Sequence, residues 1–277
     1  MILLRSFCIM QGRLLPPVDG RIQSFPREQW EQEFHLAAAA GLGAIEWIYD
    51  TYGLGANPLE TGQGVARIGS LAHEHGVAVH SICADYFMDF AFVRSGDAER
   101  TERLARLGWL LGQAKRLGVT RIVLPFVDQS AIRDVADREA AVDALDRALP
   151  AAEAAGIELH LETSLAPDDF VRLLACLPHP LVSVNYDSGN SSSLGYKPAE
   201  EFAAYGDRVG SVHVKDRVRN GGTVPLGQGD ADLDAMFTCL HNLNYAGDIV
   251  LQVARGIAGD ELAWARHNRA FVERKIH

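Results

Sequence analysis

A junction that recurs along the chain constrains its fold more than any other sequence feature. A helix-like stretch ends at a glycine, one or two residues follow, and a β-branched apolar run begins, at Gly41, Gly76, Gly118, Gly156 and Gly247. Glycine suits this position because the residue after a helix often adopts the left-handed conformation, which side chains disfavour. The junctions therefore predict helices that are each followed directly by a strand.

The spacing of these junctions predicts a barrel. Strictly alternating strand–helix units imply a parallel sheet, and eight units in 277 residues fit a single-domain α/β fold, the (β/α)8 TIM barrel, over residues 1–277. An open doubly wound sheet is the alternative, but the first turn lacks the G-x-G-x-x-G pattern. We expect eight helices to alternate with strands at 2–9, 44–49, 77–83, 120–126, 157–162, 181–187, 210–215 and 248–253.

Composition excludes several classes of protein. Lys and Arg total 26 and Asp and Glu total 36, a formal net charge of −10, whereas nucleic-acid-binding proteins need a basic surface that displaces phosphate counterions. No apolar run reaches the roughly 18 residues of a membrane span. The four cysteines lie far apart, which predicts reduced thiols. We therefore expect a soluble, cytoplasmic protein that contacts neither nucleic acid nor membranes.

Polar side chains gather at the carboxyl ends of four consecutive expected strands, where a barrel of this kind builds its active site. They are Glu162, Asp187, His213 and Gln252. Taken singly, each is more simply a buried polar group bonded to its neighbours. Buried carboxylates are costly unless they are compensated, and carboxylate plus imidazole suits a divalent cation such as Mn²⁺, Mg²⁺, Co²⁺ or Zn²⁺. The four together therefore predict one divalent metal site.

Five short motifs resemble those of a known family. In chain order they are GLGAIEW, LHLET, NYDSGN, SVHVKDR and LGQGDADLD. They resemble the xylose isomerase-like TIM barrels, the superfamily of sugar and sugar-phosphate isomerases and epimerases that also includes endonuclease IV. In that family a Glu, an Asp, a His and a second Glu hold one divalent metal. The resemblance carries the first three roles onto Glu162, Asp187 and His213.

Gln252 departs from this family pattern, because a glutamate usually stands at its position. The carbonyl oxygen of a glutamine can still bind a hard cation, but it is neutral and cannot accept a proton. We therefore expect a more weakly bound and more Lewis-acidic metal. The change also removes half of the paired-glutamate machinery by which the family's epimerases work on both faces of a carbon.

The segment after His213 places basic residues at every second position, at Lys215, Arg217 and Arg219. Barrels often bind a phosphate or another anion near the last two strands, and the planar fork of arginine suits carboxylate or phosphate. A solvated basic loop is the alternative, although Lys215 shares the strand face of His213. We expect Lys215 to be catalytic together with Glu162, and the two arginines to bind substrate.

Other polar residues near the strand ends lie where substrate hydroxyls could be met. The principal candidates are Asn190, Glu46 and His80. Further candidates, in the loops after the first, third and fourth expected strands, are Gln11, Arg13, Asp85 and Asp128. For Glu46, a buried structural acid is an equally good interpretation.

The hypothesis that best joins these residues is a metal-dependent isomerase or epimerase acting on a small sugar or sugar phosphate. The metal would chelate adjacent carbonyl and hydroxyl oxygens and acidify the intervening C–H. Glu162 would remove that proton to give an enediolate, and Lys215 would stabilise the oxyanion or return a proton.

Three other functions stay open. A metal-dependent dehydratase of a keto-sugar or keto-inositol would also need only one base. A DNA-repair nuclease would need further His and Glu ligands and a basic face, which the sequence lacks. Gln252 keeps open a catalytically silent barrel with a binding role. The large outward-facing helical surfaces leave room for a homodimer or homotetramer.

Overall fold

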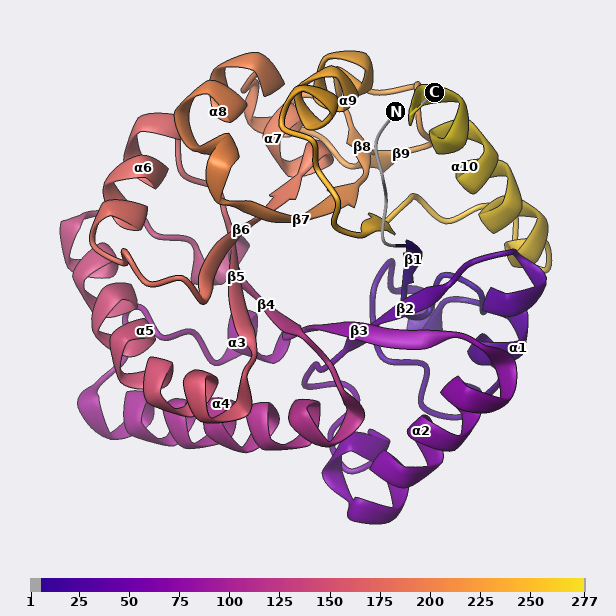
Figure 1. Cartoon of the computed structure of the whole chain (residues 1–277), viewed down its shortest axis with the longest axis horizontal. Coiled ribbons are helices and arrows are strands. Elements are labelled where there is room, and N and C mark those ends of the chain that lie inside the picture. The colour runs from indigo at the N-terminus through magenta and orange to yellow at the C-terminus, as the bar shows by residue number, and fades with distance from the viewer. Residues whose placement is uncertain (1–5, 277) are drawn as a thin grey trace.

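Eight parallel strands close into a barrel in the computed structural model, which describes residues 6–276. Consecutive strands are neighbours around the ring, and β10 pairs with both β7 and β1 to close it (Figure 1). The predicted (β/α)8 TIM barrel is therefore confirmed. The barrel strands are β1 (Phe7–Met10), β2 (Ala44–Ile48), β3 (Ala78–Cys83), β4 (Arg121–Phe126), β5 (Glu158–Thr163), β6 (Val182–Asp187), β7 (Val209–Val214) and β10 (Ile249–Leu251).

Helices form a ring around the barrel (Figure 1). The α-helices are α1 (Gln32–Ala39), α2 (Gly62–His75), α3 (Tyr86–Asp89), α4 (Asp97–Leu117), α5 (Val135–Ala155), α6 (Pro167–Ala175), α7 (Ser188–Leu194), α8 (Pro198–Tyr205), α9 (Leu233–Asn242) and α10 (Glu261–Ile276). Short 3-10 helices are η1 (Val18–Gly20), η2 (Pro58–Glu60), η3 (Asp128–Ser130) and η4 (Gly206–Arg208).

Left-handed glycines end the helices at four of the five predicted junctions. Gly41, Gly76, Gly118 and Gly156 have φ between 64° and 73°, so each helix stops and the chain enters the next strand directly. At the fifth junction the expectation for Gly247 is wrong. Asn244 takes the positive φ of 51° after α9 instead, because asparagine adopts this conformation more readily than most residues.

The predicted strands lie within one or two residues of the observed boundaries, and residues 2–5 of the first fall outside the described residues. The additions are the short helices α3 and α7 and a hairpin of β8 (Asp216–Arg217) and β9 (Thr223–Val224). Strands of two residues carry no alternation that a sequence pattern could reveal. The Asp216 carboxylate fixes this hairpin by accepting backbone N–H bonds from Gly227, Gly229 and Ala231 at 2.8 to 3.0 Å.

The interior of the barrel is polar, whereas the layer between strands and helices is apolar. Glu46, Arg121, His213 and Asp248 are each at most 4% exposed, and the apolar core residues form one continuous cluster around them. Polar groups buried this deeply require partners. The interior is therefore where the chemistry of this chain must be sought.

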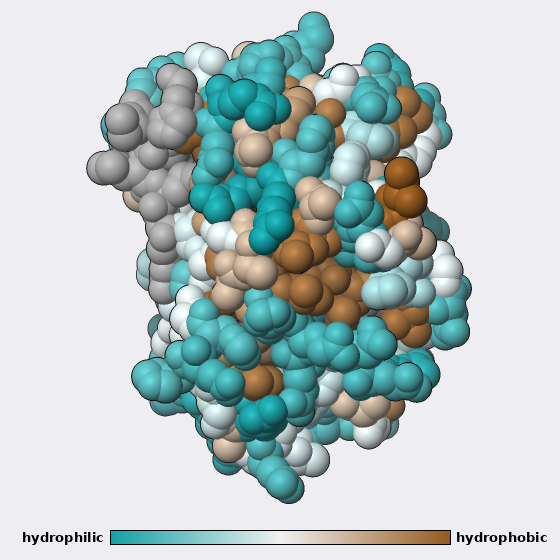
Figure 2. Space-filling model, turned by 90° about the vertical axis from the view of Figure 1, so that its right-hand side faces the viewer, coloured by the Kyte–Doolittle hydropathy of each residue, from teal (hydrophilic) through white to brown (hydrophobic). Residues whose placement is uncertain are grey.

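The outer surface mixes hydrophobic and hydrophilic residues. Figure 2, which faces the side of α1, α2 and α10, shows a hydrophobic strip bordered by hydrophilic side chains. Within the described residues, no helix has the length and apolar character needed to cross a membrane.

Candidate metal centre and substrate cavity

Three of the four predicted metal ligands meet at the carboxyl ends of adjacent strands. Glu162 on β5, Asp187 on β6 and His213 on β7 each offer a ligand atom, and these atoms lie within 4.8 Å of one another. Nδ1 of His213 lies 3.1 Å from Oε2 of Glu162 and 4.0 Å from Oδ2 of Asp187. All three residues are buried. Two carboxylates and one imidazole could hold a divalent cation here.

The two ring nitrogens of His213 have different surroundings. Nε2 lies 2.6 Å from Oε1 of Glu46, so the Nε2–H group can donate to that carboxylate. Nδ1 is buried and has no hydrogen-bond partner among the described residues, although it faces two carboxylates. A histidine that ligates a metal through one nitrogen usually donates from the other to a carboxylate. The surroundings of His213 therefore fit a metal bound at Nδ1.

The electrostatics of His213 support the same conclusion. Burial opposes charge on the ring, but the carboxylates of Glu46 and Glu162 outweigh it and raise the pKa of His213 to about 10. The carboxylates thus favour positive charge at this position, which a proton or a metal ion would supply.

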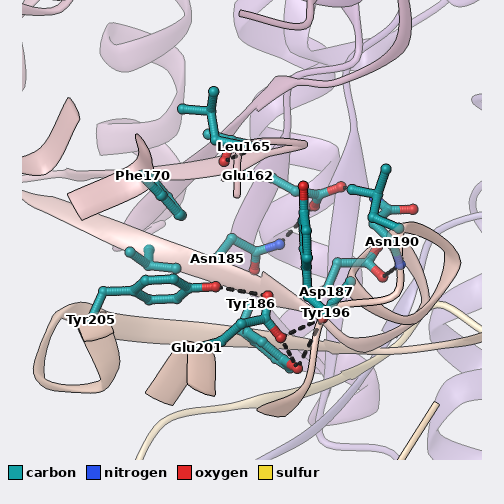
Figure 3. A pocket seen from close by; sticks show the side chains of 14 residues that line it. Glu162, Leu165, Phe170, Asn185, Tyr186, Asp187, Asn190, Tyr196, Glu201 and Tyr205 are labelled. Atoms are coloured by element: carbon teal, nitrogen blue, oxygen red, sulfur yellow. Dashed lines mark hydrogen bonds between the residues drawn. The ribbon is translucent and has the colours of Figure 1, made fainter. Parts of the chain in front are cut away.

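Both oxygens of the Glu162 carboxylate are oriented by amides. Nδ2 of Asn185 donates to Oε2 at 2.8 Å, and Nδ2 of Asn190 donates to Oε1 at 2.7 Å. Oδ1 of Asp187 caps α7 by accepting from the N–H groups of Gly189 and Asn190 at 2.8 Å, which leaves Oδ2 facing the cluster. Figure 3 shows Glu162, Asn185, Asp187 and Asn190 grouped on one side of this site.

The buried carboxylate of Glu201 holds α7 in place through hydrogen bonds. Oε2 of Glu201 accepts from Tyr186 Oη at 2.9 Å and from Ser191 Oγ, and Oε1 accepts from Tyr205 Oη at 2.9 Å (Figure 3). Burial raises the pKa of Glu201. Because Ser191 follows Asn190 on α7, this cluster fixes the helix that orients Glu162.

Lys215 joins the cluster to Gln252. Its Nζ donates to Oδ2 of Asp187, Oδ1 of Asn190 and Oε1 of Gln252, each at 3.1 Å. Gln252 thus shares a donor with Asp187 and lies at the edge of the cluster, with its carbonyl oxygen facing Lys215. Its Nε2 donates to Oε1 of Gln23 at 3.1 Å.

A cavity of about 500 Å³ has Lys215 in its wall. Asn190 and Arg217, two of the predicted substrate-binding residues, contribute to its wall. The lining residues are Arg13, Ile22, Gln23, Asp50, Tyr52, Asp85, Met88, Asp89, Val127, Asp128, Asn190, Lys215, Arg217, Gly222, Thr223 and Gln252. The cavity is large enough for a monosaccharide.

Four residues named as candidates for substrate contact are not among the described residues that line this cavity. Gln11 is buried, and its Oε1 accepts from the Ile48 N–H at 2.9 Å. Glu46 is fully buried and contacts the His213 ring, so its position fits the alternative interpretation as a buried structural acid rather than contact with a substrate in this cavity. Nδ1 of His80 lies 3.1 Å from Asp248, because the β2–β3 register passes from Val79 to Ser81 and places Ser81 opposite Glu46. Arg219 is exposed, and its guanidinium lies against Gly195.

The structure adds residues that were given no role from the sequence. Asn185 lies two positions before Asp187, so strand parity could have placed it on the same face. Gln23 bonds both Asp85, at 2.7 Å, and Gln252, but it comes from an irregular loop that offers no sequence signal. Burial raises the pKa of Asp85 to about 6, although hydrogen bonds from Gln23 and Cys83 oppose the shift.

The chain is similar to a known protein family and to several characterised or named proteins. The family model described as xylose isomerase-like TIM barrel matches residues 34–275. The chain is 24% identical over 241 residues to the putative L-ribulose-5-phosphate 3-epimerase SgbU of Escherichia coli K12, covering 81% of this chain and 83% of that protein. It is 30% identical over 211 residues to a 2-epi-5-epi-valiolone 7-phosphate 2-epimerase of Actinoplanes sp., covering 74% and 75%.

An inosose dehydratase of Geobacillus kaustophilus is 27% identical over 164 residues, covering 50% of this chain and 53% of that protein. Among solved structures, an IolI protein with a bound zinc atom has a TM-score of 0.78 at 16% identity, covering 98% of each chain. An L-ribulose 3-epimerase has a TM-score of 0.77 at 16% identity, covering 98% of this chain and 94% of that one. At these identities the structures establish the shared fold.

Proposed function

Because the chain belongs to the xylose isomerase-like TIM barrel family, we propose that it is a metal-dependent isomerase or epimerase of a small sugar or sugar derivative. The observation that supports this most directly is the buried Nδ1 of His213, which faces Glu162 and Asp187 without a hydrogen-bond partner among the described residues. Two similar proteins are named as a putative L-ribulose-5-phosphate 3-epimerase and a 2-epi-5-epi-valiolone 7-phosphate 2-epimerase, and the similar IolI structure contains zinc.

Glu162, Asp187 and His213 would hold the divalent metal, with Oε1 of Gln252 as the candidate fourth ligand. When bound, the metal would polarise the substrate carbonyl and acidify the adjacent C–H. Glu162, held by Asn185 and Asn190, would take that proton and leave an enediolate. Lys215 would stabilise the oxyanion or return a proton to the neighbouring carbon. One base suffices for interconversion of an aldose and a ketose.

Hydrogen exchange tests this proposal whichever product the protein forms. The protein is incubated in D₂O with Mn²⁺ and a panel of ketoses, aldoses and keto-inositols, and deuterium at the carbon next to the carbonyl is followed by NMR. We expect exchange that stops on addition of a chelator and returns with Mn²⁺. Absence of exchange with every sugar, in protein shown to hold metal, would contradict the proposal.

A dehydratase acting beside a carbonyl is the second candidate function. Gln252 supports it, because this residue cannot serve as a second base and a dehydratase needs only one. The inosose dehydratase of Geobacillus kaustophilus is among the similar proteins. Loss of water from a keto-inositol, seen as enone absorbance, would favour this function over isomerisation.

A further inference from the structure

The cavity that has Asn190, Lys215 and Gln252 in its wall identifies a class of substrate. Asn190 bonds to Glu162 and Lys215 bonds to Asp187, so the cavity adjoins the metal cluster. We propose that this cavity receives an uncharged polyhydroxy ketone or cyclitol and discriminates against phosphorylated sugars. This inference rests on the proposed function, since it concerns the substrate of the same site. Two features support it. The three cations that line the cavity already donate hydrogen bonds to protein acceptors, and four carboxylates line the same space.

Arg217 is engaged by its own hairpin. Its Nε and Nη2 both donate to the carbonyl oxygen of Gly221, at 3.0 and 2.8 Å, and its Nη1 donates to Oδ1 of Asn190 at 2.9 Å. The guanidinium therefore holds the turn between β8 and β9 together. Turning its fork towards a phosphate would break these bonds.

The other two cations of the cavity wall, Arg13 and Lys215, also donate hydrogen bonds to protein acceptors. Nε of Arg13 donates to Val253 O at 2.9 Å, and its two terminal nitrogens donate to Ile22 O and Gln23 Oε1. Nζ of Lys215 has three protein acceptors. The metal cluster adds no net charge, because Glu162 and Asp187 would balance a divalent cation. None of these groups is free to form the bidentate contact by which arginine binds phosphate.

Four carboxylates face the same space, so among the described lining residues the acids outnumber the three cations. Asp85 accepts from Gln23 at 2.7 Å, Asp89 accepts from Thr51 Oγ1 at 2.5 Å, and Asp50 accepts backbone N–H bonds from Phe25 and Gly53. Asp128 lies on the rim as an exposed residue. Each carboxylate keeps lone pairs that can accept from a hydroxyl group.

Carboxylates treat hydroxyl groups and phosphates in opposite ways. A sugar hydroxyl donates to a carboxylate in a charge-assisted hydrogen bond. A phosphate dianion in the same cavity meets four carboxylates and three cations whose donors are already hydrogen-bonded within the protein. At an effective dielectric near that of a protein surface, each nearby carboxylate costs about fivefold or more in affinity. Such repulsion is a means of specificity, because it weakens the wrong ligand without requiring new contacts to the right one.

The test compares matched substrates with and without phosphate at pH 8, where Asp85 is ionised. L-Ribulose is paired with L-ribulose 5-phosphate, and D-allulose with D-allulose 6-phosphate, with exchange in D₂O and turnover as readouts on the Mn²⁺-loaded protein. We expect kcat/KM or the exchange rate to favour the uncharged member of an active pair by at least about tenfold. Equal or faster reaction of the phosphorylated member would overturn the inference and leave the proposed function standing.

Removing two carboxylate charges from the cavity tests whether they cause the preference for the uncharged sugar. In the double variant Asp89→Asn, Asp128→Asn, the preference for the uncharged sugar should fall by about fivefold or more. The substitution at Asp128 is conformationally mild, because asparagine tolerates its φ of 50°, so the single variant serves if the double variant folds poorly. Asp146→Asn, at an exposed position on α5 outside the cavity lining, removes a carboxylate charge elsewhere on the chain and should leave the ratio unchanged.

Three further results would overturn the inference. An unchanged ratio in the cavity variants would show that the carboxylates do not discriminate. An equal change in Asp146→Asn would assign the effect to overall charge. No exchange, turnover or binding with either member of any pair, or with a keto-inositol, would remove the proposed function and this inference with it.

Discussion

The two ends of the barrel interior hold clusters that are alike in distance and different in charge. Near the carboxyl ends, Glu162, Asp187 and His213 offer ligand atoms within 4.8 Å of one another. Near the amino ends, Cys8, His80 and Asp248 meet the same criterion. We refer to these as the upper and lower clusters. Distance alone would make either of them a metal site.

The two clusters differ in how far the charges of the chain itself compensate their buried carboxylates. In the lower cluster, Oδ2 of Asp248 accepts from Arg121 Nη1 at 2.7 Å and lies 3.1 Å from Nδ1 of His80. Burial and the neighbouring Asp248 raise the pKa of the Cys8 thiol well above its usual value, so a thiolate ligand is disfavoured there. The positive charge that this carboxylate needs is already built into the chain. In the upper cluster, Lys215 contacts Asp187 at 3.1 Å, but the buried Nδ1 of His213 has no hydrogen-bond partner among the described residues.

Disrupting the lower cluster should lower the stability of the protein and leave its metal affinity nearly unchanged. Asp248→Asn would leave Arg121 buried without its counter-ion, which costs about 3–5 kcal/mol when one partner of a buried ion pair is removed. Chemical denaturation should show this loss, while calorimetric metal affinity of the folded variant stays near that of the parent. A large fall in metal affinity with little change in stability would reverse the roles of the two clusters.

Breaking the upper cluster should do the opposite. Glu162→Gln keeps an oxygen ligand and removes the proton acceptor, so kcat should fall at least about 10²-fold, the lower end for loss of a general base. Steady-state kinetics on the best substrate would measure this, with the melting temperature as a control for folding. Near-normal turnover would place the base elsewhere, and Lys215 would be the next candidate.

Glu46 lies between the clusters and should affect the upper one. It bonds His213 Nε2 at 2.6 Å and Ser81 Oγ at 2.5 Å, and Ser81 in turn accepts from Arg121 at 3.2 Å. Glu46→Gln should weaken metal binding by about 10- to 100-fold, as loss of a carboxylate behind a ligating histidine does. Competition with a chelator of known affinity measures the change. An unaltered metal Kd would separate Glu46 from the metal site.

The smallest predicted effect concerns the edge of the upper cluster. Gln252→Glu adds a negative charge beside Lys215 and Asp187. It should tighten metal binding and lower isomerisation or dehydration about several-fold, because a further carboxylate reduces the Lewis acidity of the metal and repels an enediolate. Kinetics of both proteins with metal titrated in would measure this. A gain in epimerisation would show instead a two-base epimerase that has lost its second glutamate.

Periodicity and parity in the sequence predict the features that one strand determines. The glycines at 41, 76, 118 and 156 mark the helix ends, and Glu162, Asp187 and His213 follow from strand position. What depends on several segments was not predictable in this way. The irregular register at His80 turns that residue away from the cavity, and the Gln23 contacts arise from a loop without regular structure.

The basic residues after His213 also have contacts that the sequence pattern does not predict. The basic residues at 215, 217 and 219 predict an anion site by their spacing. Their spacing does not reveal that Lys215 bonds to Gln252 and Arg217 to Asn190, or that Arg219 is not among the described residues that line the cavity. Local spacing reveals which side chains share a strand face, but the partners of a long flexible side chain depend on the assembled fold.

Anomalous diffraction from crystals of the Mn²⁺- or Zn²⁺-loaded protein would show which of the two clusters binds metal. We expect one metal peak per chain, bound by Glu162, Asp187 and Nδ1 of His213 at about 2.0–2.4 Å, with no peak in the lower cluster. A metal bound between Cys8, His80 and Asp248, or an upper cluster that stays empty at saturating metal, would contradict this expectation.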